Sequence, residues 1–101
     1  MISGSGATLR NSTASTNQLT GATVSGVRNR IEGNNFTGNN TSNDGTSGAG
    51  LLVTGTNNIV VSNSATGNAV FDFKIGAVNT AGTIQGPAPA PITEPSANVV
   101  Y

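Results

Sequence analysis

The chain has no cysteine, no histidine and no tryptophan, and charged residues make up only 8% of its 101 residues. The absence of cysteine excludes disulfide bridges and cysteine-based metal sites. The absence of histidine excludes a histidine-assisted nucleophile. The four acidic residues are scattered along the sequence, at Glu32, Asp44, Asp72 and Glu94, so no paired-carboxylate site is indicated. We therefore expect no catalytic residue, no cofactor and no bound metal.

The charges are also balanced, with four Lys or Arg against four Asp or Glu. Because no basic patch is available to hold a phosphate backbone, we expect no nucleic-acid partner. The longest apolar runs, 51–53 and 59–61, are far shorter than the about 18 residues of a membrane helix, so we expect no membrane span. The N-terminus has no basic stretch followed by an apolar core, and we expect no signal peptide in this chain.

The sequence contains one motif that occurs twice. Residues 21–39 match residues 50–68 at a constant offset of 29 residues, without a gap. The identical pairs are Gly21/Gly50, Val24/Val53, Gly26/Gly55, Asn29/Asn58, Asn34/Asn63, Thr37/Thr66, Gly38/Gly67 and Asn39/Asn68. Self-similarity at a fixed spacing is the signature of repeat architectures. It predicts a β-solenoid.

Each copy contains three short runs in which apolar and polar residues alternate, and Asn and Gly interrupt these runs. Alternation with such punctuation predicts strands separated by turns, and Asn and Gly tolerate the left-handed backbone of sharp corners. The inward candidates are Ala22, Val24, Ile31 and Phe36 in the first copy and Leu51, Val53, Val60 and Ala65 in the second. We expect a core of Val24, Val53, Phe73, Ile31, Val60, Phe36 and Ala65.

The recurring asparagines predict ladders inside the coil. If one copy is one turn, equivalent residues stack about 4.8 Å apart, the spacing of hydrogen-bonded strands. The predicted ladder pairs are Asn29 with Asn58, Asn34 with Asn63, and Asn39 with Asn68. An amide carries both a donor and an acceptor, so a column of amides can satisfy itself. The alternative is that these asparagines are exposed loop residues, which need not recur in register.

The residues before the repeat resemble an incomplete earlier turn. The same offset predicts three pairs: Ile2 on Ile31, Ala7 on Phe36, and Thr8 on Thr37. We expect upstream β-helix turns, or a homo-oligomer partner, to cover the N-terminal end.

After the repeat, the alternation of Phe71, Phe73 and Ile75 with Asp72 and Lys74 predicts another strand. We expect Phe71 and Phe73 to stack beneath Leu51 and Val53. Residues 40–49 form a polar insertion that the second copy lacks.

The C-terminal residues interrupt the pattern. Prolines at 87, 89, 91 and 95 cannot donate to a strand ladder and prefer extended polyproline geometry. We expect residues 1–85 to form the coil, with 21–49 and 50–78 as the repeated pair, and residues 86–101 to form a Pro-rich capping tail. In this prediction Ile92, Ala97, Val99 and Tyr101 cover the exposed coil end, since an open edge promotes aggregation. The predicted fold class is an all-β, right-handed parallel β-helix of about three turns.

Two groups of polar residues are candidates for surface function. Arg28, Arg30 and Glu32 alternate with apolar or amide residues, and the geometry of a strand places them on one outward face. They are interpreted as a solvated, salt-bridged face, the alternative being a clamp for acidic sugars. Asp44 lies in the polar insertion, where it could contact a ligand or Ca²⁺, although one carboxylate is a poor calcium site.

The run 57–68, followed by 71–75 and closing on 94–101, resembles the C-terminal end of bacterial right-handed parallel β-helix repeat proteins of the pectate-lyase-like superfamily. The most specific parts are Asn-Ser-Ala-Thr-Gly-Asn at 63–68 and Pro-x-Ala-Asn-x-x-Tyr at 95–101. The resemblance implies a secreted or cell-surface protein that acts on or holds polysaccharide. Lyases of the family hold Ca²⁺ with clustered Asp or Glu and use Arg or Lys as a base, and its hydrolases use grouped Asp; neither set is present in this chain.

We therefore expect a non-catalytic structural or carbohydrate-binding end segment of a secreted or cell-surface β-helix protein. One alternative is the C-terminal piece of a polysaccharide lyase or glycoside hydrolase whose catalytic turns lie upstream. Another is a phage-fibre or adhesin stalk. Ice binding is a further alternative, for which Thr8, Thr37 and Thr66 are expected to form one column.

Overall fold

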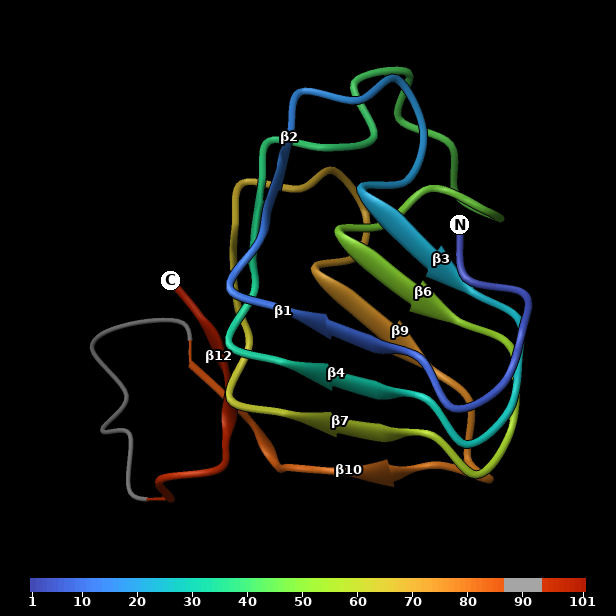
Figure 1. The fold of residues 1–101 in the computed structure, drawn as a ribbon. Coiled ribbons are helices and arrows are strands. Elements are labelled where there is room, and N and C mark those ends of the chain that lie inside the picture. Colours follow the sequence, from blue (N-terminus) through green and yellow to red (C-terminus); the bar gives the residue numbers. More distant parts are fainter. Residues whose placement is uncertain (87–93) are drawn as a thin grey trace.

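The structure, a computed structural model, describes residues 1–86 and 94–101. Within these residues every regular element is a short β-strand (Figure 1). The strands are β1 (Thr8–Arg10), β2 (Thr13–Ser15), β3 (Ala22–Val24), β4 (Arg30–Glu32), β5 (Asn35–Thr37), β6 (Leu51–Val53), β7 (Ile59–Val61), β8 (Ser64–Thr66), β9 (Phe73–Ile75), β10 (Thr80–Ala81), β11 (Ile84–Gln85) and β12 (Asn98–Val100). The prediction of an all-β chain is confirmed.

The strands form three sheets, and all of the strand pairs are parallel. The first sheet has the order β1-β4-β7-β10, the second β11-β12-β8-β5-β2, and the third β3-β6-β9. Up to β10, consecutive strands visit the first, second and third sheets in rotation (Figure 1). Each circuit of the chain therefore pairs with the next, an arrangement compatible with a parallel β-helix.

The number of residues that separates equivalent positions of neighbouring circuits depends on whether the loop 40–49 lies between them. Ala7 donates a backbone hydrogen bond to the Asn29 side chain across 22 residues, whereas Asn29 donates to the Asn58 side chain across 29. The next step, from Asn58 to Asn79, is again short at 21 residues. The offset of 29 in the sequence is therefore a shorter circuit plus an insertion.

This difference changes the pairing of the first residues. The observed partners are Leu9 with Ile31, Ala14 with Phe36, Ser15 with Thr37 and, as an isolated bridge, Ile2 with Val24. The predicted pairs Ile2 with Ile31, Ala7 with Phe36 and Thr8 with Thr37 are wrong, because the offset of 29 holds only for circuits that the loop 40–49 separates.

The aromatic residues after the second copy also differ from the prediction. The observed pairs are Phe73 with Leu51 and Ile75 with Val53. Placing Phe71 and Phe73 beneath Leu51 and Val53 is therefore wrong. Phe71 belongs to the corner that leads into β9, where its ring lies 4.8 Å from the Lys74 ammonium group. Phe71 precedes the strand, so the inward positions of β9 begin at Phe73.

The core lies inside the coil and consists of the inward residues of the three sheets. Its buried members are Val24, Ile31, Phe36, Leu51, Val53, Val60, Ala65 and Phe73. The middle residue of β4 shows the alternation, since Ile31 is fully buried between exposed Arg30 and half-buried Glu32. The rings of Phe36 and Phe73 meet edge to face, with centroids 6.5 Å apart. These contacts fill the narrow space between the sheets.

The C-terminal strand lies out of sequence order. β12 pairs with β8 on one side and β11 on the other, so it forms part of the second sheet. Ala97 is buried, Val99 is half-buried and Tyr101 is 67% exposed, and the capping role of these residues stays a prediction. Ile92 and the prolines of 87–91 lie outside the described residues.

Burial at Ile31 makes a testable prediction. We expect Ile31→Asp to abolish the cooperative thermal unfolding transition, because an unpaired charge in the core costs several kcal/mol. Ile59→Asp is the matched control, since Ile59 is 37% exposed on the neighbouring strand β7 and should retain a cooperative transition. Circular dichroism during heating measures both. Similar melting of the two variants would show that Ile31 does not face the core.

Candidate functional site

The most regular polar feature of the molecule is a set of asparagine columns at the corners of the coil. In the first column the backbone N–H of Asn29 donates to Asn58 Oδ1 at 2.8 Å. Asn58 Nδ2 donates to the carbonyl oxygen of Gly26 and to Asn79 Oδ1, both at 3.0 Å. Asn58 has no exposed surface. Each amide therefore bonds to the circuit before it and to the circuit after it.

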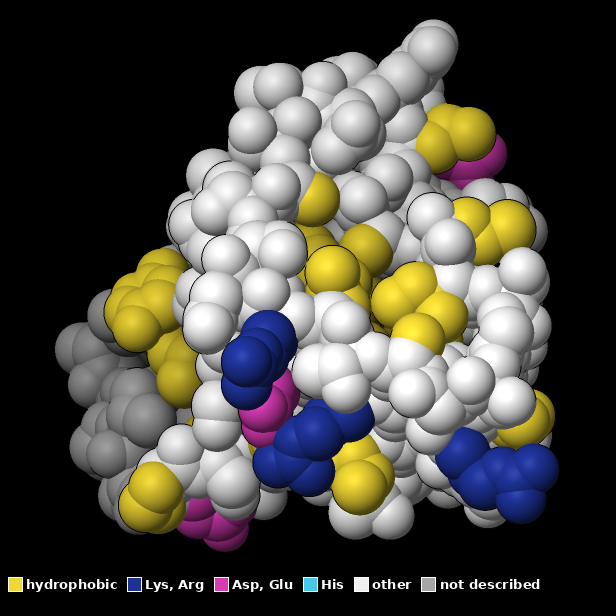
Figure 2. All heavy atoms as spheres, in the orientation of Figure 1, with side chains coloured by type: hydrophobic (Ala, Val, Ile, Leu, Met, Phe, Trp, Pro, Cys, Tyr) yellow, Lys and Arg dark blue, Asp and Glu magenta, His cyan; other side chains and the backbone are white. Residues whose placement is uncertain are grey.

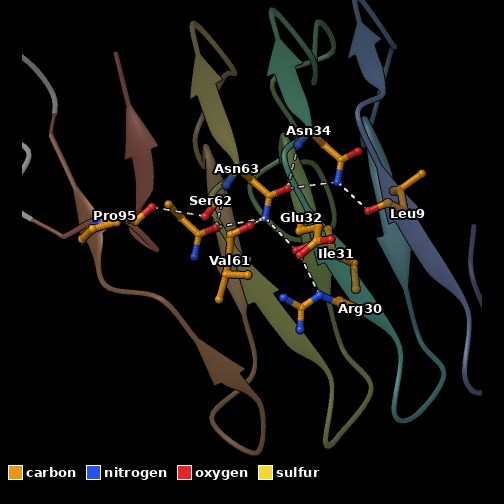
Figure 3. Close-up of polar contacts among 10 residues, drawn as sticks. Leu9, Arg30, Ile31, Glu32, Asn34, Val61, Ser62, Asn63 and Pro95 are labelled. Carbon is orange, nitrogen blue, oxygen red and sulfur yellow. Dashed lines mark hydrogen bonds and ion pairs between the residues drawn. The ribbon is translucent and has the colours of Figure 1, made fainter.

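The second column runs through Asn34, Asn63 and Asn98. Figure 3 shows the contact between Asn34 and Asn63. Asn34 Nδ2 donates to the carbonyl oxygen of Leu9 at 2.9 Å and to Asn63 Oδ1 at 3.0 Å. Asn63 Nδ2 donates in the same way to the carbonyl oxygen of Ile31 and to Asn98 Oδ1. The pattern of the first column is thus repeated at a different corner.

The third column contains Asn17, Asn39 and Asn68 and ends on a carboxylate. Asn39 Nδ2 donates to Asn68 Oδ1 at 2.9 Å, and Asn68 Nδ2 donates to Asp72 Oδ1 at 2.8 Å. An ionised carboxylate only accepts hydrogen bonds, so Asp72 receives the last donor without needing an acceptor of its own. Across the described residues, no buried side-chain nitrogen or oxygen lacks a partner.

Sequence reasoning missed Asn79, Asn98 and Asp72 as members of the columns. A signal for Asn79 exists, because Gly-x-x-Asn occurs at 26–29, 55–58 and 76–79. At the first two sites a Cβ on the glycine would overlap a carbonyl oxygen of the preceding circuit, so glycine is required there. No sequence spacing indicates Asn98, which joins its column from 35 residues beyond Asn63.

The outer face of the second sheet carries only uncharged polar side chains on β2, β5 and β8. Register places these side chains in two rows: Thr13, Asn35 and Ser64 in one, and Ser15, Thr37 and Thr66 in the other. Of the expected column of Thr8, Thr37 and Thr66, the pair Thr37 and Thr66 is confirmed, whereas the place of Thr8 is wrong because Thr8 pairs with Arg30 in the first sheet. The observed face is mixed in Thr, Ser and Asn.

An open groove of about 370 Å³ adjoins this face where β8 meets the C-terminal residues. Its lining residues are Ser62, Asn63, Ser64, Glu94, Pro95, Ala97, Val99 and Tyr101. Ser62 Oγ donates to the carbonyl oxygen of Pro95 at 3.3 Å (Figure 3). The groove thus presents hydroxyl groups, a carboxylate and an exposed aromatic ring beside the hydroxyl-rich face.

The outer face of the first sheet is charged. Arg30 Nε lies 2.6 Å from Glu32 Oε2 (Figure 3), and Arg10 is the register partner of Glu32. The pairing agrees with a solvated, salt-bridged face. Arg28 differs, since its φ of 55° places it at the corner before β4 and outside the alternation of the strand.

The loop 40–49 is tied down by its own carboxylate and by neighbouring circuits. Asp44 Oδ1 accepts backbone N–H groups from Thr46 at 2.8 Å and Ser47 at 2.6 Å. These bonds, that from Ser47 first, hold the pKa of Asp44 below its ordinary value of 3.8. Lys74 Nζ donates to the carbonyl oxygen of Thr46 at 2.7 Å. Asp44 therefore serves the loop itself.

The N-terminal end of the coil is an apolar hollow of about 340 Å³. Ile2, Leu9, Ala14, Ala22 and Phe36 contribute apolar side chains to its lining. Figure 2 shows hydrophobic side chains in the middle of the view, surrounded mainly by uncharged other side chains and backbone.

Residues 1–86 and 94–101 contain no group of three or more His, Cys, Asp or Glu side chains that could hold a metal ion. No helix long and apolar enough to cross a membrane occurs in this part of the chain. No family model matches the chain, and comparisons with curated proteins and with solved structures return no match.

The columns predict a large stability difference between two neighbouring asparagine positions. We expect Asn63→Ala to lower the free energy of unfolding by about 2–4 kcal/mol, because the backbone N–H and Nδ2 of Asn34 lose their acceptor. Asn35→Ala is the control, since Asn35 is exposed and should change stability by less than about 0.5 kcal/mol. Urea denaturation measures both. Equal losses would contradict a special role for the columns.

Asp44 predicts a pH dependence of the loop. Because its folded pKa is lowered, the hydrogen bonds from Thr46 and Ser47 are fully present above 3.8 and are lost only as pH falls through the lower folded value. We expect the amide resonances of these two residues in NMR spectra to move with a midpoint below pH 3.8, and to show no such transition in Asp44→Asn. A transition centred above 3.8 would contradict this geometry.

Proposed function

We propose that this chain is a non-catalytic, carbohydrate-binding segment of a secreted or cell-surface right-handed parallel β-helix protein related to the pectate-lyase-like superfamily. Right-handed winding is the strong preference of parallel crossover connections. The proposed binding surface is the outer face of β2, β5 and β8. The observation that carries the proposal is that all six outward positions of these strands bear uncharged hydroxyl or amide groups.

Hydrogen bonding on this face leaves capacity for a ligand. Thr37 Oγ1 and Ser64 Oγ both donate to Asn35 Oδ1, at 3.2 Å and 3.1 Å, so the hydroxyl groups are held in place. Each hydroxyl oxygen keeps acceptor capacity. Rows of hydroxyl and amide groups can form hydrogen bonds with the hydroxyl groups along a polysaccharide chain. The lack of charge favours neutral polysaccharides over acidic ones.

The positions of three of the four acidic residues support the non-catalytic part of the proposal, and the fourth, Glu94, lines the groove without a second acidic side chain in that lining. Glu32 pairs with Arg30, Asp44 closes its own loop, and Asp72 ends an asparagine column. An end piece of a lyase or glycosidase, or a fibre stalk, remains an alternative role for the same coil. In either role we propose that upstream turns or a second copy cover the apolar hollow at the N-terminal end.

The proposal predicts selective binding to neutral polysaccharides. We expect xylan or β-glucan, but not acidic homogalacturonan, to retain the chain in affinity electrophoresis. The double variant Asn35→Ala/Thr37→Val removes two hydrogen-bonding groups worth about 1 kcal/mol each and should weaken binding by about tenfold or more.

Thr8→Val is the control, because Thr8 is exposed on β1 in a different sheet and should leave binding unchanged. The proposal fails if neither neutral polysaccharide binds, or if the double variant binds as tightly as the native chain.

A further inference from the structure

The position of β12 in the second sheet is unusual because the chain skips this place and returns to it. β10 pairs with β7 in the first sheet, and β11 then lies one strand beyond the place next to β8. β12 fills the vacant place, parallel to both of its neighbours (Figure 1). We call this place, between β8 and β11, the strand slot.

Backbone and amide hydrogen bonds hold β12 in the strand slot. The N–H groups of Val99 and Tyr101 donate to the carbonyl oxygens of Asn63 and Ala65, at 2.7 Å and 2.9 Å. On the other side, the N–H of Asn98 donates to the carbonyl oxygen of Thr83 at 2.9 Å. The strand is therefore paired along both edges.

The side chain of Asn98 connects the strand slot to the second asparagine column. Asn98 Oδ1 accepts from the backbone N–H and from Nδ2 of Asn63, and Asn98 Nδ2 donates to the carbonyl oxygens of Val60 and Gly82. Asn98 has no exposed surface, and Ala97 has 2%. Without β12, the buried N–H of Asn63 would lose its acceptor, so the slot requires an occupant.

Two glycines beside the slot allow the backbone of this strand to approach closely. A Cβ at Gly82 would overlap the carbonyl oxygen of Ser96, and a Cβ at Gly86 would overlap that of Val100. Gly86 also has a φ of 105°, which side chains rarely adopt. The slot is thus shaped to the backbone of 96–100.

None of these contacts depends on the segment that joins β11 to β12. The same strand from another molecule would form the same bonds, and the attached strand has only the advantage of its higher effective concentration. Exchange of an identical element is a low-cost route to dimers.

We propose that the strand slot accepts residues 94–101 of a second copy of this chain, giving a reciprocally swapped dimer. The dimer forms at high chain concentration and keeps the hydrogen bonds of β12 in the strand slot. This interaction is independent of the proposed polysaccharide binding.

Because the chain has no cysteine, engineered cysteines can report the exchange. Ser64 and Val99 are register partners on β8 and β12. Ser64→Cys and Val99→Cys chains are mixed at high concentration under reducing conditions, warmed to permit strand exchange, cooled and oxidised. We expect a disulfide-linked heterodimer whose yield rises with chain concentration.

Two controls make the result decisive. The double variant Ser64→Cys/Val99→Cys, oxidised at low concentration, should form an internal disulfide, which tests the strand slot itself. Thr13→Cys mixed with Val99→Cys should give no heterodimer, because Thr13 occupies the same row on β2, away from β12. The proposal is overturned if the Ser64→Cys mixture gives no more heterodimer than the Thr13→Cys mixture, or if the double variant does not form its internal disulfide.

Discussion

The structure depends on one requirement, that a buried amide must have partners on both sides. A side chain such as Asn58, with no exposed surface, would destabilise the fold if its donors and acceptor were unpaired. Stacking one asparagine per circuit solves this, because each amide accepts from the circuit before it and donates to the circuits on both sides. The requirement fixes the register of the strands, since a shift of one residue would break every column.

The columns explain how a chain with few apolar and charged residues maintains its corners. The buried apolar cluster is small, and strands of two or three residues bury little surface. At the corners, where the backbone hydrogen bonds between strands stop, side-chain amides therefore form the hydrogen bonds between neighbouring circuits. Residues with left-handed backbone, such as Asn57 with a φ of 59°, permit these sharp corners.

The parts of the fold that follow from local pattern could be predicted, and those that depend on chain order could not. Strands around Val24, Ile31 and Phe36 follow from alternation and from their recurrence. The basic spacing could not be obtained from two copies, because the insertion 40–49 lies between them. The third Gly-x-x-Asn, ending at Asn79, contains the missing information, since it follows Asn58 after 21 residues. The place of Asn98 depends on a return of the chain that no spacing encodes.

Inward-facing and outward-facing residues have different roles in this chain. Inward positions and corners are constrained by packing and by the columns, so they contain little information about a ligand. Outward positions differ from sheet to sheet: Arg30 and Glu32 neutralise each other on the first, and Lys74 holds the inserted loop beside the third. The outer side of β2, β5 and β8 has neither an ion pair nor a covering loop contact of this kind among the described side chains. In the proposed function its hydroxyl and amide groups bind the polysaccharide, so specificity is expected to depend on Asn35 and Thr37 and not on the buried amides.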